Sequence, residues 1–191
     1  MAGEIRERMV EGAMVLLARR GLQATSFSEV LSATGAPRGS LYHHFPGGKD
    51  QLVAAAVDRA GAILSDAMES VAGEPAEAVV ERFLAIWRAV LTRSQCEAGC
   101  AVLAVTVATD SAELLSHATA VFRAWRERLA DLLRQGGVPA EPARRLAMVL
   151  IASAEGAVVL SRADQSMEPF EAVAHQLTEQ VRAMRQGKGE K

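Results

Sequence analysis

A short run of polar and basic side chains, RGSLYHHF at residues 38–45, carries the clearest chemical signal in this chain. Leu41 and Phe45 lie four residues apart, so on a helix they share one side and can dock on a core. The other side then carries Arg38, Gly39, Ser40, Tyr42 and His43. Arginine and hydroxyl side chains on an exposed helix face can pair with base edges in the major groove of DNA. The run therefore predicts a DNA recognition helix.

A preceding helix and a tight turn must position this run. Ser26 or Ser28 can cap a helix that starts there, because serine side chains accept hydrogen bonds from exposed backbone N–H groups. Gly35 offers the positive φ that ends such a helix. Pro37 suits the first position of the next helix, where no backbone N–H is needed. The pattern is typical of a helix-turn-helix.

Phosphate contacts are expected at helix starts, since helix N-termini favour anions. Three hydroxyl side chains, of Thr25, Ser26 and Ser28, lie at one such start. Lys49 lies at another. We expect these four residues to hold the DNA backbone while Arg38 and His43 reach base edges or nearby phosphates.

The run GAPRGSLYHHFPGGK, residues 35–49, resembles the helix-turn-helix signature of TetR-type transcriptional repressors. The usual signature is Gly, a small or branched residue, Ser, a basic residue, Gly, Thr or Ser, then Leu-Tyr-x-x-Phe and a nearby Lys. Here Pro37 replaces the common Ser, which could change one base or phosphate contact, and Gly47-Gly48 loosens the approach to Lys49. The resemblance covers residues 4 to about 60 and implies a homodimer that binds double-stranded operator DNA.

The later part of the chain resembles the ligand-binding half of the LmrA-type branch of that family. The resemblance lies in Gly99-Cys100 before an apolar segment, the Phe122-x-x-Trp125 pair and the run at residues 154–157. It implies repression of transport or resistance genes and a response to hydrophobic, often aromatic, small molecules.

Composition and charge are consistent with a compact helical regulator. The chain has 191 residues, half of them hydrophobic, only 4% aromatic, and a formal charge of −2. Strand-like alternation is absent, so the expected fold class is all-α. Residues 1–49 have a net charge of +2. This small excess indicates a DNA binder that relies on placed contacts rather than on a diffuse basic surface.

The expected organisation is a three-helix DNA-binding domain at residues 1–48 and a helical effector-binding and dimerisation domain at 49–191. A connecting helix at 49–71 joins them. Further helices are expected at 76–93, 100–109, 112–135, 141–163 and 168–186. Residues 146–160 are apolar but short and contain Glu155, and no signal peptide is present. We therefore expect a cytoplasmic protein.

An apolar chamber for the inducer is predicted where aromatic stripes of two helices meet the uncharged 100–109 segment. The alternative is that these aromatics fill an ordinary core. The expected lining consists of Phe83, Trp87, Val102, Thr106, His117, Phe122, Trp125, Ile151 and Glu155.

A twofold dimer is predicted because residues 146–160 are apolar around most of a helix and need burial on two sides. The 168–186 helix would complete a four-helix interface, and the operator should then be palindromic. The expected interface residues are Leu146, Leu150, Ser153, Ala157, Leu160, Phe170, Val173, Leu177 and Val181.

Other chemistry finds little support. His43 and His44 are adjacent and point about 100° apart on a helix, so no metal site is expected. Cys96 and Cys100 are read as buried or half-buried thiols, with a disulfide or redox switch as the alternative. No cofactor and no catalytic set is expected, since His117, His175, Glu155 and the two cysteines form no nucleophile–base series.

A ligand-released repressor is the favoured reading, with an α-helical enzyme and an adaptor without DNA binding as the alternatives. The sequence leaves open the inducer, the operator, the regulated genes, and repression versus activation.

Overall fold

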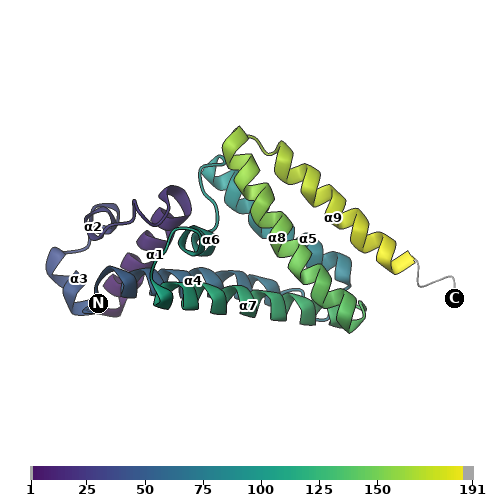
Figure 1. The fold of residues 1–191 in the computed structure, drawn as a ribbon, viewed down its shortest axis with the longest axis horizontal. Coiled ribbons are helices and arrows are strands. Elements are labelled where there is room, and N and C mark those ends of the chain that lie inside the picture. Colours follow the sequence, from purple (N-terminus) through teal and green to yellow (C-terminus); the bar gives the residue numbers. More distant parts are fainter. Residues whose placement is uncertain (1, 187–191) are drawn as a thin grey trace. The chain divides into compact units, whose positions relative to one another are not determined.

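The computed structural model describes residues 2–186, and every regular element in that range is an α-helix (Figure 1). The helices are α1 (Ala2–Arg20), α2 (Phe27–Thr34), α3 (Arg38–His44), α4 (Gly48–Glu69), α5 (Ala76–Ser94), α6 (Ala101–Thr106), α7 (Ala112–Gln135), α8 (Ala140–Asp164) and α9 (Glu168–Gln186). The expected all-α fold is confirmed, and most predicted helix ends lie within two residues of the observed ones.

The turn between α2 and α3 forms as its residue types dictate. Ser26 is the cap of α2, because its Oγ accepts a hydrogen bond from the Glu29 N–H at 3.2 Å. Gly35 ends α2 with φ 63°, a left-handed conformation that costs glycine little. Pro37 was predicted to be the first residue of the second helix, but α3 begins one residue later, at Arg38. Pro37 precedes the helix in an extended conformation. These residues fix where the recognition helix begins.

The chain divides into two compact units. Unit 1 consists of Met1–Ile63 and Cys100–Phe122, and unit 2 of Leu64–Gly99 and Arg123–Lys191. Helices α4 and α7 each contribute to both units. The predicted functional boundary at residues 48–49 is a different division, because compactness and function need not separate a chain at the same residue. It stays a prediction.

Unit 1 packs α1 against α2 and α6. Gly12 allows the close approach of α1 and α2, since the Thr34 methyl group occupies the space that a Cβ at residue 12 would need. Phe45, at the end of α3, is fully buried, and the Arg6 guanidinium lies 5.4 Å from the centre of its ring. The contacts of Phe45 thereby hold the end of α3 against the rest of unit 1.

Unit 2 contains the α8–α9 hairpin, whose helices lie side by side and both contact α5 (Figure 1). Arg88 on α5 donates two hydrogen bonds to the Glu171 carboxylate on α9, at 2.6 and 2.8 Å. These hydrogen bonds lower the pKa of Glu171, and the attraction of the two charges adds to the effect. The same guanidinium lies over the buried Phe170 ring at 5.6 Å. The hairpin is thus tied to α5 by both polar and aromatic contacts.

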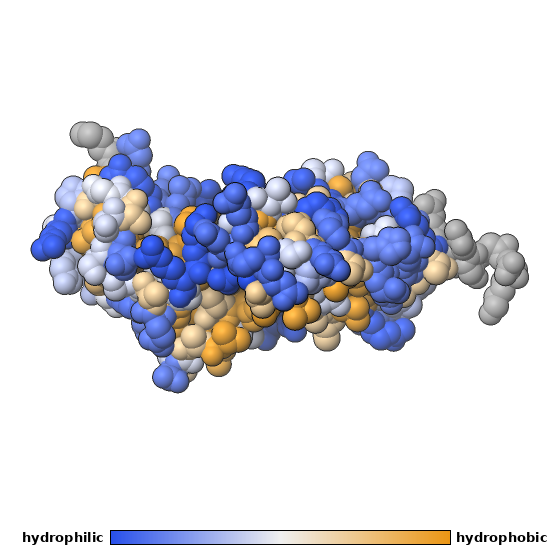
Figure 2. Space-filling view, turned by 90° about the horizontal axis from the view of Figure 1, so that it is seen from above, coloured by the Kyte–Doolittle hydropathy of each residue, from blue (hydrophilic) through white to orange (hydrophobic). Residues whose placement is uncertain are grey.

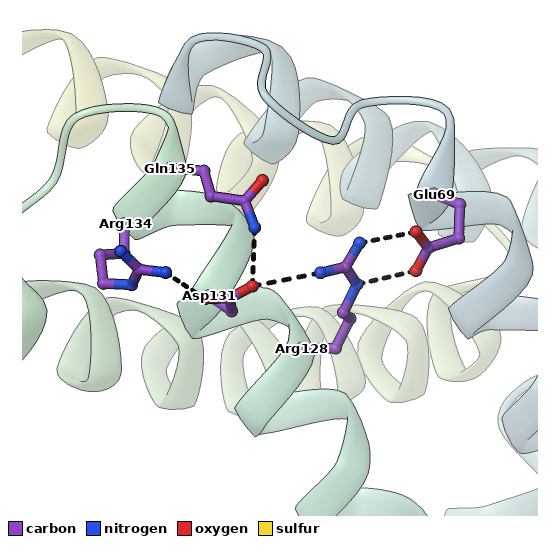
Figure 3. Close-up of polar contacts among 5 residues, drawn as sticks. All are labelled: Glu69, Arg128, Asp131, Arg134 and Gln135. Atoms are coloured by element: carbon purple, nitrogen blue, oxygen red, sulfur yellow. Dashed lines mark hydrogen bonds and ion pairs between the residues drawn. The ribbon is translucent and has the colours of Figure 1, made fainter.

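A polar network joins the last turn of α4 to α7 within unit 2 (Figure 3). Arg128 donates to both oxygens of Glu69, at 2.7 and 2.6 Å, and to Asp131 at 3.2 Å. Asp131 also accepts hydrogen bonds from Arg134 and Gln135, each at 2.7 Å. The Arg134 hydrogen bond is the main reason that the pKa of Asp131 is lowered. The network fixes the end of α4 against α7.

By length and composition alone, α8 is the one helix among the described residues that is apolar enough to cross a membrane. Half of its most apolar window is buried inside this chain. The apolar composition of α8 is therefore partly explained by packing.

Candidate nucleic-acid interface

Helix α3 presents the polar face that its spacing predicts. Leu41 and Phe45 are buried, whereas Arg38, Gly39 and His43 are exposed. Tyr42 is 72% exposed, so it does not support the core. An arginine and several polar side chains on one exposed helix face can contact base edges and phosphates.

Ser40 lies on the flank of this face and is half-buried. Its Oγ donates to the Pro37 carbonyl at 2.6 Å, and the Ser40 backbone N–H donates to the same carbonyl at 3.0 Å. The hydroxyl oxygen still has lone pairs that can accept a hydrogen bond. Ser40 therefore stabilises the start of the helix and remains able to contact DNA.

Two of the predicted phosphate contacts make internal hydrogen bonds. Thr25 is buried, and its Oγ1 donates to the Gly21 carbonyl at 2.9 Å. The Lys49 ammonium donates to the Leu22 carbonyl at 3.0 Å. Both bonds brace the segment that follows α1. An ammonium has three donors, so Lys49 can hold this carbonyl and a phosphate together.

Ser26 and Ser28 lie at the start of α2, with their Oγ atoms 2.9 Å apart. Ser28 is exposed and Ser26 is half-buried. They border an open concavity of about 740 Å³ between α2 and α3. It is lined by Ser26, Phe27, Ser28, Leu31, Ser32, Ala36, Arg38, Leu41 and Tyr42.

Phe27 is the residue of this concavity that sequence reasoning missed. Its ring meets the ring of Tyr42 edge to face, with centroids 6.1 Å apart and planes at 76°. A lone aromatic beside capping serines gives no periodic signal, so only the fold shows that it lies next to the recognition helix.

The residues predicted to line an inducer chamber are divided between the two units. Unit 2 holds Phe83, Trp87, Trp125, Ile151 and Glu155, all buried. Trp87 and Trp125 meet edge to face, with ring centroids 6.5 Å apart. A small cavity of about 10 Å³ lies beside Phe83 and Trp125. This volume is about the size of one water molecule.

The other four predicted lining residues belong to unit 1. Thr106 donates to the Val102 carbonyl at 2.8 Å, and His117 Nδ1 lies 3.2 Å from Asp58 Oδ1. Phe122 is half-buried. The chamber made of all nine residues stays a prediction.

A groove of about 450 Å³, larger than the cavity beside Phe83 and Trp125, opens in unit 2 between the start of α8 and the end of α9. Its mainly apolar walls include Leu146, Val149, Val181 and Met184. Sequence reasoning did not find this groove, because two of these residues were assigned to the dimer interface and no pattern shows where neighbouring helices diverge.

Most residues predicted for the dimer interface are buried within a single chain. These are Leu146, Leu150, Ala157, Phe170, Leu177 and Val181. Ser153 and Val173 are half-buried, and Leu160 is exposed. A helix that is apolar on most sides does not reveal which side its own chain covers.

Another face of α8 remains uncovered. Figure 2 shows hydrophobic residues at the surface among hydrophilic ones. On α8 the large exposed apolar residues are Met148, Val149, Val159 and Leu160. We define the free face of α8 as these four together with the exposed Ala152 and Gly156, which lie between them.

Cys96 and Cys100 are buried cysteines that are not joined by a disulfide, as expected. Cys100 Sγ accepts a hydrogen bond from the Leu103 N–H at 3.3 Å, so this thiol caps α6.

Two family models match the chain. Residues 9–56 match the model of bacterial regulatory proteins of the tetR family, and residues 75–176 match the LmrA/YxaF-like transcriptional regulator C-terminal domain. Among curated proteins, the uncharacterized HTH-type transcriptional regulator Rv0196 of Mycobacterium tuberculosis is 36% identical over 181 residues, covering 90% of this chain and 91% of that protein. The HTH-type transcriptional regulator LmrA of Bacillus subtilis is 28% identical, covering 88% and 92%. A crystal structure of a TetR transcriptional regulator from Chloroflexus aurantiacus aligns with a TM-score of 0.74 at 28% identity, covering 94% and 95%.

Proposed function

Because this chain belongs to the TetR family of DNA-binding transcriptional regulators, and so is not an enzyme, we propose that it is a homodimeric repressor released from a palindromic operator by a hydrophobic small molecule. The observation that carries the DNA-binding part is the outward face of α3. Its two apolar residues are buried while Arg38, Tyr42 and His43 remain exposed. A helix with this division can dock in the major groove without loss of its own packing.

The free face of α8 supports a dimer. Large apolar side chains at residues 148, 149, 159 and 160 surround Ala152 and Gly156. Contiguous exposed apolar surface marks interaction sites, and small residues at its centre allow two helices to approach closely. A twofold axis across this face brings the same residues of two chains together. Two recognition helices then face successive major grooves, which accounts for a palindromic operator.

Arg38→Ala tests the DNA contacts. If Arg38 pairs with a guanine, the variant should bind the DNA upstream of the protein's own gene more weakly. The binding free energy should become less favourable by about 1–3 kcal/mol. It should also discriminate less at one base pair in each half-site. Arg93→Ala is the matched control, because it removes the same charge from an exposed site in unit 2. Fluorescence anisotropy in constant salt gives both affinities; equal binding by the two variants would remove Arg38 from the interface.

A buried indole supports ligand binding in unit 2. The Trp87 side chain is buried, and no residue in the described part of the chain accepts a hydrogen bond from its Nε1. A buried donor without an acceptor costs about 1–3 kcal/mol. A flat apolar ligand with a carbonyl or phenolic oxygen could supply that acceptor beside the two tryptophan rings.

The small cavity lined by Trp125, the partner of Trp87 in the ring contact, suggests how a ligand would act on DNA binding. Leu64, Ser65 and Met68 of α4 share its wall with Phe83 and Trp125. A ligand that enlarged this cavity would displace α4, which begins four residues after the end of α3. Such coupling requires only that the ligand prefer one position of α4.

Trp87→Phe tests this ligand site. The change removes the unsatisfied donor but keeps an aromatic ring, so the free energy of unfolding should change by less than about 1.5 kcal/mol. Planar aromatic ketones and phenols should quench tryptophan fluorescence and release DNA from the wild-type protein, and both effects should weaken in the variant. Quenching of the wild type without DNA release would show that the site binds ligands but does not control the operator complex.

A further inference from the structure

We propose that Phe27 and Tyr42 form an apolar surface that reads the 5-methyl group of thymine, so that each operator half-site contains a thymine beside the base pair contacted by Arg38. The proposal rests on the assignment of α3 to the major groove. It adds a base preference that the helix-turn-helix alone does not imply.

The two rings come from different helices and hold each other in place. Phe27 is the first residue of α2 and Tyr42 lies in α3, and their planes meet at 76° with centroids 6.1 Å apart. Edge-to-face pairs of this kind are favourable, so the Tyr42 ring has a defined position although 72% of the residue is exposed. A fixed apolar ring at the surface of a DNA-binding helix is available for contact with a base.

The concavity around this pair has distinct polar and apolar parts. The polar lining residues are Ser28 and Ser32 of α2, its cap Ser26, and Arg38 of α3. The other lining residues are Phe27, Leu31, Ala36, Leu41 and Tyr42. The hydroxyl and guanidinium groups suit phosphates and a guanine edge. The rings and aliphatic side chains of the other part carry no charge and can contact a methyl group.

Thymine is the DNA base that matches such a surface. In the major groove it alone presents a methyl group, whereas cytosine presents an amino donor that an apolar ring cannot satisfy. Arg38 and Tyr42 are four residues apart on α3, so they share one side of the helix. Arg38 on a guanine therefore places Tyr42, and Phe27 beside it, near a neighbouring base pair.

The test removes only the methyl group. The tightest-binding duplex is first selected from a random pool, and each thymine is then replaced singly by deoxyuridine. At one thymine in each half-site, the wild-type affinity should fall about fourfold, as expected for the loss of one buried methyl contact. Replacement in both half-sites should lower the affinity by about the square of that factor.

Two variants assign the effect to the aromatic pair. Phe27→Ala and Tyr42→Ala should bind the thymine duplex more weakly than wild type and show no further loss with deoxyuridine, because the contact is already absent. Tyr42→Ala keeps the test valid if Phe27→Ala does not fold, since Tyr42 is largely exposed. Tyr42→Phe is the control and should keep its sensitivity to the methyl group.

Two results would overturn the inference: a wild-type affinity indifferent to every deoxyuridine replacement, or the same fourfold loss in both alanine variants. In either case a duplex has been selected, and the proposed repressor function still stands. If the pool yields no preferred duplex at all, the proposed function fails and this inference fails with it.

Discussion

Replacement of Val159 by aspartate should leave the protein monomeric and lower its operator affinity by at least about a hundredfold, or about 2.7 kcal/mol. Val159 is 50% exposed in the single chain and lies on the free face of α8. A second copy would bury it, and a carboxylate without a partner in an apolar interface costs several kcal/mol. A monomer engages only one half-site, so the contacts of the second recognition helix are lost.

Light scattering at micromolar concentration measures the mass, and anisotropy measures operator binding. Val107→Asp is the control, because it makes the same chemical change at a valine that is 74% exposed in unit 1. It should remain dimeric. A dimeric Val159→Asp variant would show that another surface holds the subunits together.

Phe45→Ala should lower the free energy of unfolding by about 3–5 kcal/mol, the usual cost of removing a buried phenylalanine ring. Phe45 is 0% exposed and closes the end of α3 against the core of unit 1. The change also removes the ring over which the Arg6 guanidinium lies. DNA binding should be lost because α3 no longer has a fixed position.

Denaturant unfolding followed by circular dichroism measures this effect. Tyr42→Ala removes an aromatic ring from the same helix but at an exposed position, so the free energy of unfolding should fall by no more than about 1.5 kcal/mol, the contribution of its edge-to-face contact with Phe27. Equal stability of the two variants would contradict the division of α3 into buried and exposed sides.

The helix-turn-helix could be read from the sequence because its signals are local. Ser26, Gly35, Leu41 and Phe45 each occupy the position that their chemistry predicts: a cap, a left-handed helix end and two buried docking residues. The ends of α4 and α7 were also predictable, because glycine and proline at residues 73–75 and 136–139 break the apolar periodicity between helices.

Contacts between distant segments could not be predicted in this way. Arg128 and Glu69 are 59 residues apart, and nothing in either neighbourhood indicates that they pair. Lys49 reads as a surface cation, yet its ammonium also holds the Leu22 carbonyl. Both contacts depend on how the helices pack, which periodicity does not encode.

The two sides of α8 illustrate the same limit. Leu150 and Val159 look equivalent in the sequence because the helix is apolar around most of its circumference, but the first is buried and the second exposed. Likewise, an aromatic stripe predicts burial but not the size of a cavity, so the 450 Å³ groove beside Val149 had no signal.

A cleavage reagent tethered to α3 tests most directly that this helix from each subunit enters the major groove. Ser40→Cys is nearly isosteric, and the native thiols of Cys96 and Cys100 are buried, so an iron chelate can be attached selectively at residue 40. If α3 of each subunit enters the major groove, the cuts should form two symmetric clusters, with centres one helical turn of about 10 base pairs apart or a multiple of it. The same chelate on Arg93→Cys in unit 2 is the control. A chelate at residue 40 that cuts the bound operator no more specifically than this control, or in a single cluster, would contradict the account.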